Sequence, residues 1–277
     1  MMNFQLVADS SCDVTAELKK RLGVTIVPLT LTLGEKFYVD DEKLNLQKFM
    51  KDMKNCTQRI GSAASAPALF QDAFKKGVTS FAVTLSENLS GSYGSAMLGK
   101  SMAEENGADV HVFNSKSASA GEVLLALKIR SMIDLGLKKA EIIENMKIYI
   151  DEMKTYFVLE SIDNLMKNGR LNKVVGKLIS ILNIKPVMKA DGSGNIALHS
   201  HARGRGQIVE KLADTIEKSG KNTKGETMVI THCNNPSLST QLMNVIKKRY
   251  FFKEILVVPT RGLSSLYADD KGIVIAF

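Results

Sequence analysis

Residues 84–96 read Thr-Leu-Ser-Glu-Asn-Leu-Ser-Gly-Ser-Tyr-Gly-Ser-Ala, with four serines and two glycines. The apolar run 81–83 before them predicts a buried strand, and residues 96–103 predict a helix. A loop that leads from a strand into a helix offers an anion the free N–H groups and the positive dipole end of that helix. Serine and glycine are also ordinary capping and turn residues, so this stretch alone leaves both interpretations open.

The order strand, serine-bearing loop, helix occurs three times in the first half of the chain. It is found at residues 4–13, 81–96 and 110–121, and a further serine-rich loop at 60–67 leads into an expected helix at 68–76. This alternation predicts a mostly parallel sheet with helices on both faces. Because the carboxyl ends of parallel strands meet at one edge of a sheet, we expect the three serine loops to converge on a ligand site.

The second half of the chain has a different pattern. Asp191-Gly192-Ser193-Gly194 separates two β-rich runs and predicts a hairpin, and helices are expected at 162–167 and 174–182. The predicted fold class is therefore α/β, with two domains that meet near residues 150–156. Residues 1–153 form a three-layer domain around a parallel sheet, and residues 154–277 form an α+β domain with a mixed sheet.

Composition excludes several classes of protein. The 277 residues carry a net charge of +8, but the lysines are scattered and no arginine-rich run or zinc-finger spacing suggests nucleic-acid binding. Three distant cysteines without a Cys-x-x-Cys motif predict neither disulfides nor a zinc site. No basic leader and no apolar run of about 20 residues is present, so we expect a cytoplasmic protein without stable membrane insertion.

No familiar catalytic or cofactor motif stands out. A Gly-x-Ser-x-Gly elbow after a strand, a Walker A loop and a dinucleotide fingerprint after the first strand are all missing. His199 and His201 share a strand face but have no evident third ligand, which favours a solvated hairpin face over a metal site. We therefore expect no metal, no cofactor and no catalytic residue.

Four aspartates allow a second interpretation of the N-terminal loops. Asp9, Asp13, Asp40 and Asp41 could bind Mg²⁺ beside a phosphate, but capping and surface roles are favoured. In particular, Asp13 or Ser11 is expected to cap a helix that ends near Leu22.

Five short motifs together resemble the DegV family over essentially the whole chain. In chain order they are Val-Ala-Asp-Ser-Ser-Cys-Asp at 7–13, Ile-Val-Pro-Leu at 26–29, Leu-Ser-Gly-Ser-Tyr at 89–93, Asn-Gly-Arg-Leu at 168–171 and Ile-Lys-Pro-Val at 184–187. The resemblance implies a two-domain carrier that holds a long-chain fatty acid, with the carboxylate at the domain junction and the tail in an apolar tunnel. It also implies that a separate fatty acid kinase receives the acid for phospholipid synthesis.

The resemblance also implies roles for particular residues. Ser90 matches a serine that contacts the carboxylate, with Gly91 beside it, and Arg170 matches an exposed arginine associated with kinase docking. Gly61 stands where the family carries a carboxylate-binding threonine, so we expect Ser62, a backbone N–H or water to compensate. A histidine that family members often carry near the C-terminus is not found around residues 264–267.

The sequence therefore predicts a fatty-acid carrier that is not an enzyme by itself. The rival hypothesis is an enzyme that acts on a small phosphorylated or carboxylated molecule at the same loops. A regulatory module that uses the basic surface is a third possibility.

Overall fold

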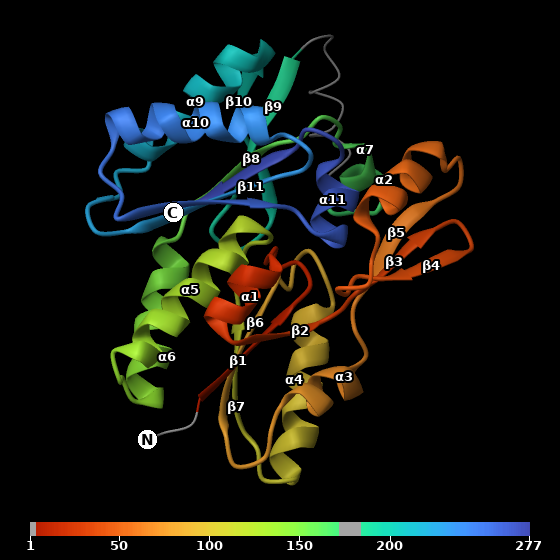
Figure 1. The fold of residues 1–277 in the computed structure, drawn as a ribbon, viewed down its shortest axis with the longest axis vertical. Coiled ribbons are helices and arrows are strands. Elements are labelled where there is room, and N and C mark those ends of the chain that lie inside the picture. Colours follow the sequence, from red (N-terminus) through yellow and green to blue (C-terminus); the bar gives the residue numbers. More distant parts are fainter. Residues whose placement is uncertain (1–3, 172–183) are drawn as a thin grey trace.

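The computed structural model describes residues 4–171 and 184–277, so the helix expected at 174–182 lies outside the described residues. A four-stranded sheet, sheet A, has the order β2-β1-β6-β7 and is parallel throughout (Figure 1). Parallel neighbours need crossover connections, and helices supply them here. The strands are β1 (Phe4–Asp9), β2 (Val24–Val27), β6 (Thr79–Thr84) and β7 (Asp109–Asn114).

Helices cover both faces of sheet A, as the sequence predicts. Alternate residues of the strands face opposite sides, so Leu6 and Val83 pack toward one layer while Val7 and Ala82 pack toward the other. The first layer holds α1 (Ala16–Leu22), α5 (Ala120–Asp134) and α6 (Lys139–Glu152), and the second holds α3 (Pro67–Ala73) and α4 (Ser92–Glu105). The parallel three-layer arrangement is confirmed.

A six-stranded mixed sheet, sheet C, is built from the second half of the chain. Its order is β10-β9-β8-β13-β11-β12, and only β11 and β12 are parallel neighbours. The hairpin predicted around residues 191–194 joins β9 to β10. The strands are β8 (Thr155–Val158), β9 (Ile184–Ala190), β10 (Ile196–Arg203), β11 (Thr227–His232), β12 (Glu254–Pro259) and β13 (Ile273–Ala276).

Helix α5 joins the two sheets. Its residues pack against β1 and β6 of sheet A and against β11 and β13 of sheet C. This explains why the first turns of α5, residues 120–126, are buried on all sides. The opposite face of sheet C is covered by α9 (Gly204–Lys218) and α10 (Pro236–Arg249), which lie at the top of Figure 1. The division into units 1–153 and 154–277 stays a prediction, because α5 belongs to the packing of both sheets.

A small antiparallel sheet of order β4-β3-β5 is the main feature that the sequence does not predict. Pro28 ends β2, and the chain leaves sheet A to form β3 (Thr30–Leu33) and β4 (Lys36–Val39). The expected loop at 60–67 is partly wrong, since Ile60–Ala63 is strand β5 and pairs with β3. This sheet packs with α2 (Leu46–Asn55) and α11 (Gly262–Ala268), and α11 also contacts the short helix α7 (Asp163–Lys167).

None of the helices in the described residues has the length and apolar character that a membrane crossing requires.

Candidate functional site

A cavity of about 120 Å³ lies where the loops of sheet A meet sheet C. Its wall is mostly aliphatic and aromatic, with hydroxyl groups and two cations set among the apolar side chains. The apolar part includes Leu85, Leu89, Phe157, Leu159, Leu165, Ile196, Leu263 and Val274, and the polar part includes Ser11, Lys116, Ser117, Ser119, Thr155, Arg170, Ser264 and Tyr267. Such a lining suits a ligand with a long apolar portion and one polar end.

The Asp9 carboxylate draws two of the serine loops together beneath this cavity. Asp9 is fully buried at the end of β1; Oδ1 accepts from Ser11 N at 3.0 Å, and Oδ2 accepts from Leu85 N at 2.9 Å and Ser92 Oγ at 2.6 Å. The third loop joins them because Ser119 N donates to Ser11 Oγ at 3.2 Å. The predicted convergence of the three serine loops is therefore confirmed.

The surface role expected for Asp13 and Asp40 is wrong, because both side chains are buried. Asp13 does not cap α1; Thr15 does, and Asp13 instead accepts from Ser119 Oγ and from Arg261 N, each at 2.5 Å. Asp40 accepts from Gly262 N at 2.9 Å and Leu263 N at 2.8 Å, and so caps α11 from a distant part of the chain. Burial raises the pKa of Asp13 to about 7 and that of Asp40 to about 6.

Asp41 and the pair of histidines have local roles. Asp41 accepts from Lys43 N at 2.8 Å within its own turn. His199 lies at an irregularity in the β10–β9 register, and its ring packs edge-on against Tyr156 with centroids 5.1 Å apart. Among the described residues, no group of three or more His, Cys, Asp or Glu side chains is placed to hold a metal ion.

The β7–α5 loop is held in a strained conformation at the cavity wall. Lys116 and Ser119 have φ values of 51° and 55°, which residues with a Cβ rarely adopt. Ser119 is fixed there by Asp13 and by a 2.6 Å hydrogen bond with Thr231 Oγ1, and Ser117 shares a 2.8 Å hydrogen bond with Thr155 Oγ1 of sheet C. Strain of this kind persists only where the surroundings hold it, and it concentrates at ligand sites.

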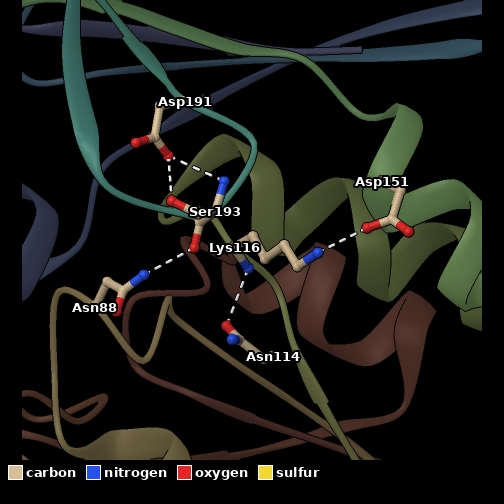
Figure 2. A network of polar contacts seen from close by, with 6 residues as sticks. All are labelled: Asn88, Asn114, Lys116, Asp151, Asp191 and Ser193. Carbon is tan, nitrogen blue, oxygen red and sulfur yellow. Dashed lines mark hydrogen bonds and ion pairs between the residues drawn. The ribbon is translucent and has the colours of Figure 1, made fainter.

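The β9–β10 hairpin closes one side of the cavity by docking on the serine loops (Figure 2). Asn88 Nδ2 donates to Ser193 O at 2.9 Å, and Ser86 Oγ donates to Gly194 O at 2.8 Å. Asp191 shapes the turn by accepting from the backbone and the hydroxyl of Ser193. Gly194 is buried at φ +92°, and a Cβ there would lie 2.3 Å from Ser86 Oγ.

The four residues expected at the carboxylate lie beside the cavity and not in its wall. Ser90 Oγ accepts from Ser92 N at 3.2 Å at the start of α4, and a Cβ on Gly91 would lie 3.7 Å from Ala64 Cβ, so their loops are neighbours. Ser62 shares a 3.0 Å hydrogen bond with the hydroxyl of Tyr267, which does line the cavity. Gly61 is buried in β5, where a Cβ would lie 3.1 Å from Asn168 Oδ1 and 3.4 Å from Thr32 Oγ1.

Arg170 is not displayed on the surface, as the sequence suggested, but is half-buried and lines the cavity. Gly169 ends α7 with φ +75°, which turns the chain back. The guanidinium then donates through Nε to Leu89 O at 3.0 Å and through Nη1 to Asn168 O at 2.6 Å. Arg170 and Leu89 thus contact each other in the cavity wall, and Tyr267 in the same wall contacts Ser62, one of the residues expected at the carboxylate.

Helix α11 supplies wall residues that the sequence analysis missed. Leu263, Ser264, Tyr267 and Ala268 all line the cavity. The apolar positions 263, 266 and 267 have the spacing of one helix face and could have predicted this helix. Its docking through Asp13 and Asp40 could not be predicted, because the partners lie far apart in sequence.

Glu122 is the other unexpected feature of the site. It lies in the first turn of α5 and is fully buried, and within the described residues neither of its carboxyl oxygens has a hydrogen-bond partner. Burial, and then the negative charge of Asp9, raise the pKa of Glu122 well above its ordinary value. Asp9 accepts three hydrogen bonds, and a second negative charge beside it would be costly, so the proton belongs on Glu122.

We predict that Glu122→Gln makes the protein less sensitive to rising pH. A glutamate in the unfolded chain loses its proton near pH 4.5, whereas Glu122 in the folded protein keeps its proton to higher pH. Ionisation in the unfolded chain therefore favours unfolding of the wild-type protein as the pH rises. The difference in unfolding free energy, variant minus wild type, should therefore increase as the pH rises above 5. The increase is at most about 1.4 kcal/mol per pH unit, over the range in which Glu122 is protonated in the folded state and ionised in the unfolded state. Urea unfolding from pH 5 to 8 measures this, and parallel curves would contradict it.

We also predict that Gly194→Ala is less stable than Gly192→Ala by about 1–3 kcal/mol, the cost of an overpacked contact. Both glycines have φ near +90°, but a Cβ on Gly192 meets nothing within 4 Å, whereas one on Gly194 meets Ser86 and Lys116. Denaturant unfolding gives the difference, and amide exchange over residues 191–195 shows whether the hairpin has detached. Equal losses in the two variants would mean that the close approach of residue 194 to Ser86 and Lys116 does not limit the stability.

Residues 3–277 match the family model described as "Uncharacterised protein, DegV family". A DegV domain-containing protein of Streptococcus pyogenes serotype M3 is 35% identical over 280 residues, which cover 100% of this chain and 99% of that protein. A DegV family protein from Ruminococcus gnavus, solved with vaccenic acid, has a TM-score of 0.94 and 34% identity, over 100% of this chain and 99% of the other. The Streptococcus pneumoniae Fatty Acid Kinase (Fak) B3 protein, solved with linoleic acid, has a TM-score of 0.91 and 32% identity with the same coverage. This chain is therefore a member of the DegV family.

Proposed function

We propose that this protein binds one long-chain fatty acid in the cavity between its two sheets. The observation that carries the proposal is the apolar cavity whose wall includes the half-buried Arg170. Its structural neighbours support it, because those from Ruminococcus gnavus and Streptococcus pneumoniae hold vaccenic and linoleic acid and a third, 27% identical, holds heptadecanoic acid. Burying each CH₂ group contributes about 0.8 kcal/mol, so the tail would supply most of the affinity.

We propose that the carboxylate of the fatty acid lies beside Arg170 in the cavity wall. Two cations line the wall, but Lys116 already pairs with Asp151 at 2.7 Å. Arg170 has no carboxylate partner among the described residues, and residues 1–3 and 172–183 contain no Asp or Glu. A fatty-acid carboxylate would therefore find an uncompensated guanidinium there, and Tyr267 lines the same cavity. Ser62, Gly61, Ser90 and Gly91 would support this part of the wall from behind.

The cavity has to widen around a long acyl chain. Its volume of about 120 Å³ is smaller than the roughly 300–1,000 Å³ of typical ligand pockets. Leucine, isoleucine and tyrosine side chains make up much of the wall, and rotamer changes among them can open the space. We expect the loaded protein to resist unfolding more than the empty one, because a ligand that binds only the folded state stabilises it.

The direct test of the proposed function is to identify the natural cargo. Protein expressed in cells supplied with fatty acids should release about one equivalent of acyl chain on organic extraction, and mass spectrometry will identify it. Native mass spectrometry before extraction gives the stoichiometry. Protein that carries no acyl chain, and binds none after delipidation, would exclude a fatty-acid carrier.

We predict that Arg170→Ala weakens fatty-acid binding by at least tenfold, because it removes the charge partner of the carboxylate. Lys116→Ala is the matched control: it removes the other cation of the wall, which Asp151 already neutralises, and should change affinity by less than threefold. Displacement of a fluorescent fatty acid measures both variants. A larger loss in Lys116→Ala would place the carboxylate at Lys116 instead of Arg170.

We further propose that the protein acts as a carrier that presents the acid to a fatty acid kinase, and is not itself the enzyme. The Fak B3 neighbour supports this step. In this proposal Arg170 links the head group to the docking surface, so Arg170→Ala loaded with fatty acid should still lose activity with a cognate kinase. Turnover of a small phosphorylated or carboxylated molecule by the protein alone, with Mg²⁺, would favour the rival enzyme.

A further inference from the structure

A second hollow lies on the other face of sheet C, under α9 and α10. Its volume is about 460 Å³, and its floor includes Val158 and Ile273, whereas their neighbours Phe157 and Val274 line the first cavity. Successive residues of a strand point to opposite faces, so the two spaces lie back to back across β8 and β13. Leu159 borders both. Apart from Leu159, no residue that lines the first cavity lines this second hollow among the described residues.

The second hollow is strongly cationic. Lys185, Arg203, Arg205 and Lys271 line it, and Glu160 is the only acidic residue among the described residues of its wall. Glu160 pairs with Lys185 at 2.9 Å. The other three cations have no carboxylate partner among the described residues, and residues 1–3 and 172–183 contain no acidic side chain that could supply one.

Two long helices begin at this wall and add to the positive potential. Gly204 and Arg205 form the first turn of α9, and Asn235 precedes the first turn of α10. The side chains of the two N-cap residues, Arg203 and Asn235, accept no hydrogen bond from the first turns of these helices in the described residues. Asn235 Nδ2 donates to Lys271 O at 2.8 Å and so holds the turn before β13, which carries Lys271, against the start of α10. The positive ends of two helix dipoles thus face the same space as the cations.

From this arrangement we infer that the second hollow binds a ligand through a phosphate group. Three uncompensated cations that share one depression repel each other, and an anion of more than one charge relieves that repulsion. A single carboxylate carries one charge and would be satisfied by one guanidinium, whereas a phosphate accepts hydrogen bonds from several donors at once. The volume of the hollow lies within the range of small-molecule sites, so a phosphorylated small molecule or a phospholipid head group fits it.

Inorganic pyrophosphate and lipid vesicles distinguish the two sources of phosphate. We expect the full-length protein to bind pyrophosphate in calorimetric titrations at fixed ionic strength, or to bind vesicles that contain phosphatidylglycerol more tightly than neutral vesicles. Pyrophosphate binding identifies a soluble phosphorylated ligand, and vesicle binding alone identifies a lipid head group. Failure of the wild-type protein to bind either probe overturns the proposal.

Three double variants test whether binding depends on this site or only on the overall positive charge of the protein. Arg203→Ala/Arg205→Ala should weaken binding of the responsive probe by at least tenfold, and Arg203→Lys/Arg205→Lys should recover most of the loss. Lys247→Ala/Lys248→Ala removes the same charge from exposed positions near the end of α10 and should change affinity by less than twofold. Equal losses in the two alanine pairs would overturn the site. Fatty-acid binding should be unchanged in all three variants, so the outcome does not depend on the proposed cargo.

Discussion

The buried carboxylate of Asp9 is the constraint on which the site depends. A charge without solvent is costly unless donors surround it, and the donors to Asp9 come from its own loop and from the loop between β6 and α4. Their positions are therefore fixed together. Leu85, whose N–H binds Asp9, also forms part of the cavity wall. The hydrogen bonds that the buried Asp9 side chain accepts therefore help to set the shape of the cavity.

The same region contains three further buried acidic side chains. Hydrogen-bond donors stabilise two of them, and protonation removes the charge of the third. Asp13 accepts from Ser119 Oγ and a backbone N–H, and Asp40 from two backbone N–H groups at the start of α11. Burial and the neighbouring Asp9 raise the pKa of Glu122 and favour its protonated form, so it adds no charge beside Asp9. Because Glu122 sits on α5, which packs against both sheets, this charge balance lies at their junction.

The sequence predicts what local patterns encode. The repeated order of strand, serine loop and helix predicts the parallel sheet and the convergence of its loops. Asp191 and the glycines that follow it predict the hairpin. The same reasoning placed Asp13 and Asp40 at the surface, because their partners at residues 261 and 262 are 248 and 222 positions away. Arg170 was predicted to be exposed for a similar reason. Its side chain is held against the cavity by a hydrogen bond to Leu89 O, 81 residues earlier in the chain. Neither the hydrophobic periodicity nor a short motif predicts hydrogen bonds between residues so far apart in the chain.

The distribution of charge is more informative than its sum. A net charge of +8 describes many proteins, and several surface cations here are neutralised by partners, as Lys116 is by Asp151 and Lys139 by Asp109. Arg170 on one side of sheet C, and Arg203 with Lys271 on the other, are cations that line hollows without an acidic partner in the described parts of the chain. Uncompensated charge in a concave space has an electrostatic cost that a ligand of opposite sign removes. The apolar wall beside Arg170 favours an anion with a long hydrocarbon tail, and the basic wall around Arg203 favours a compact anion of higher charge.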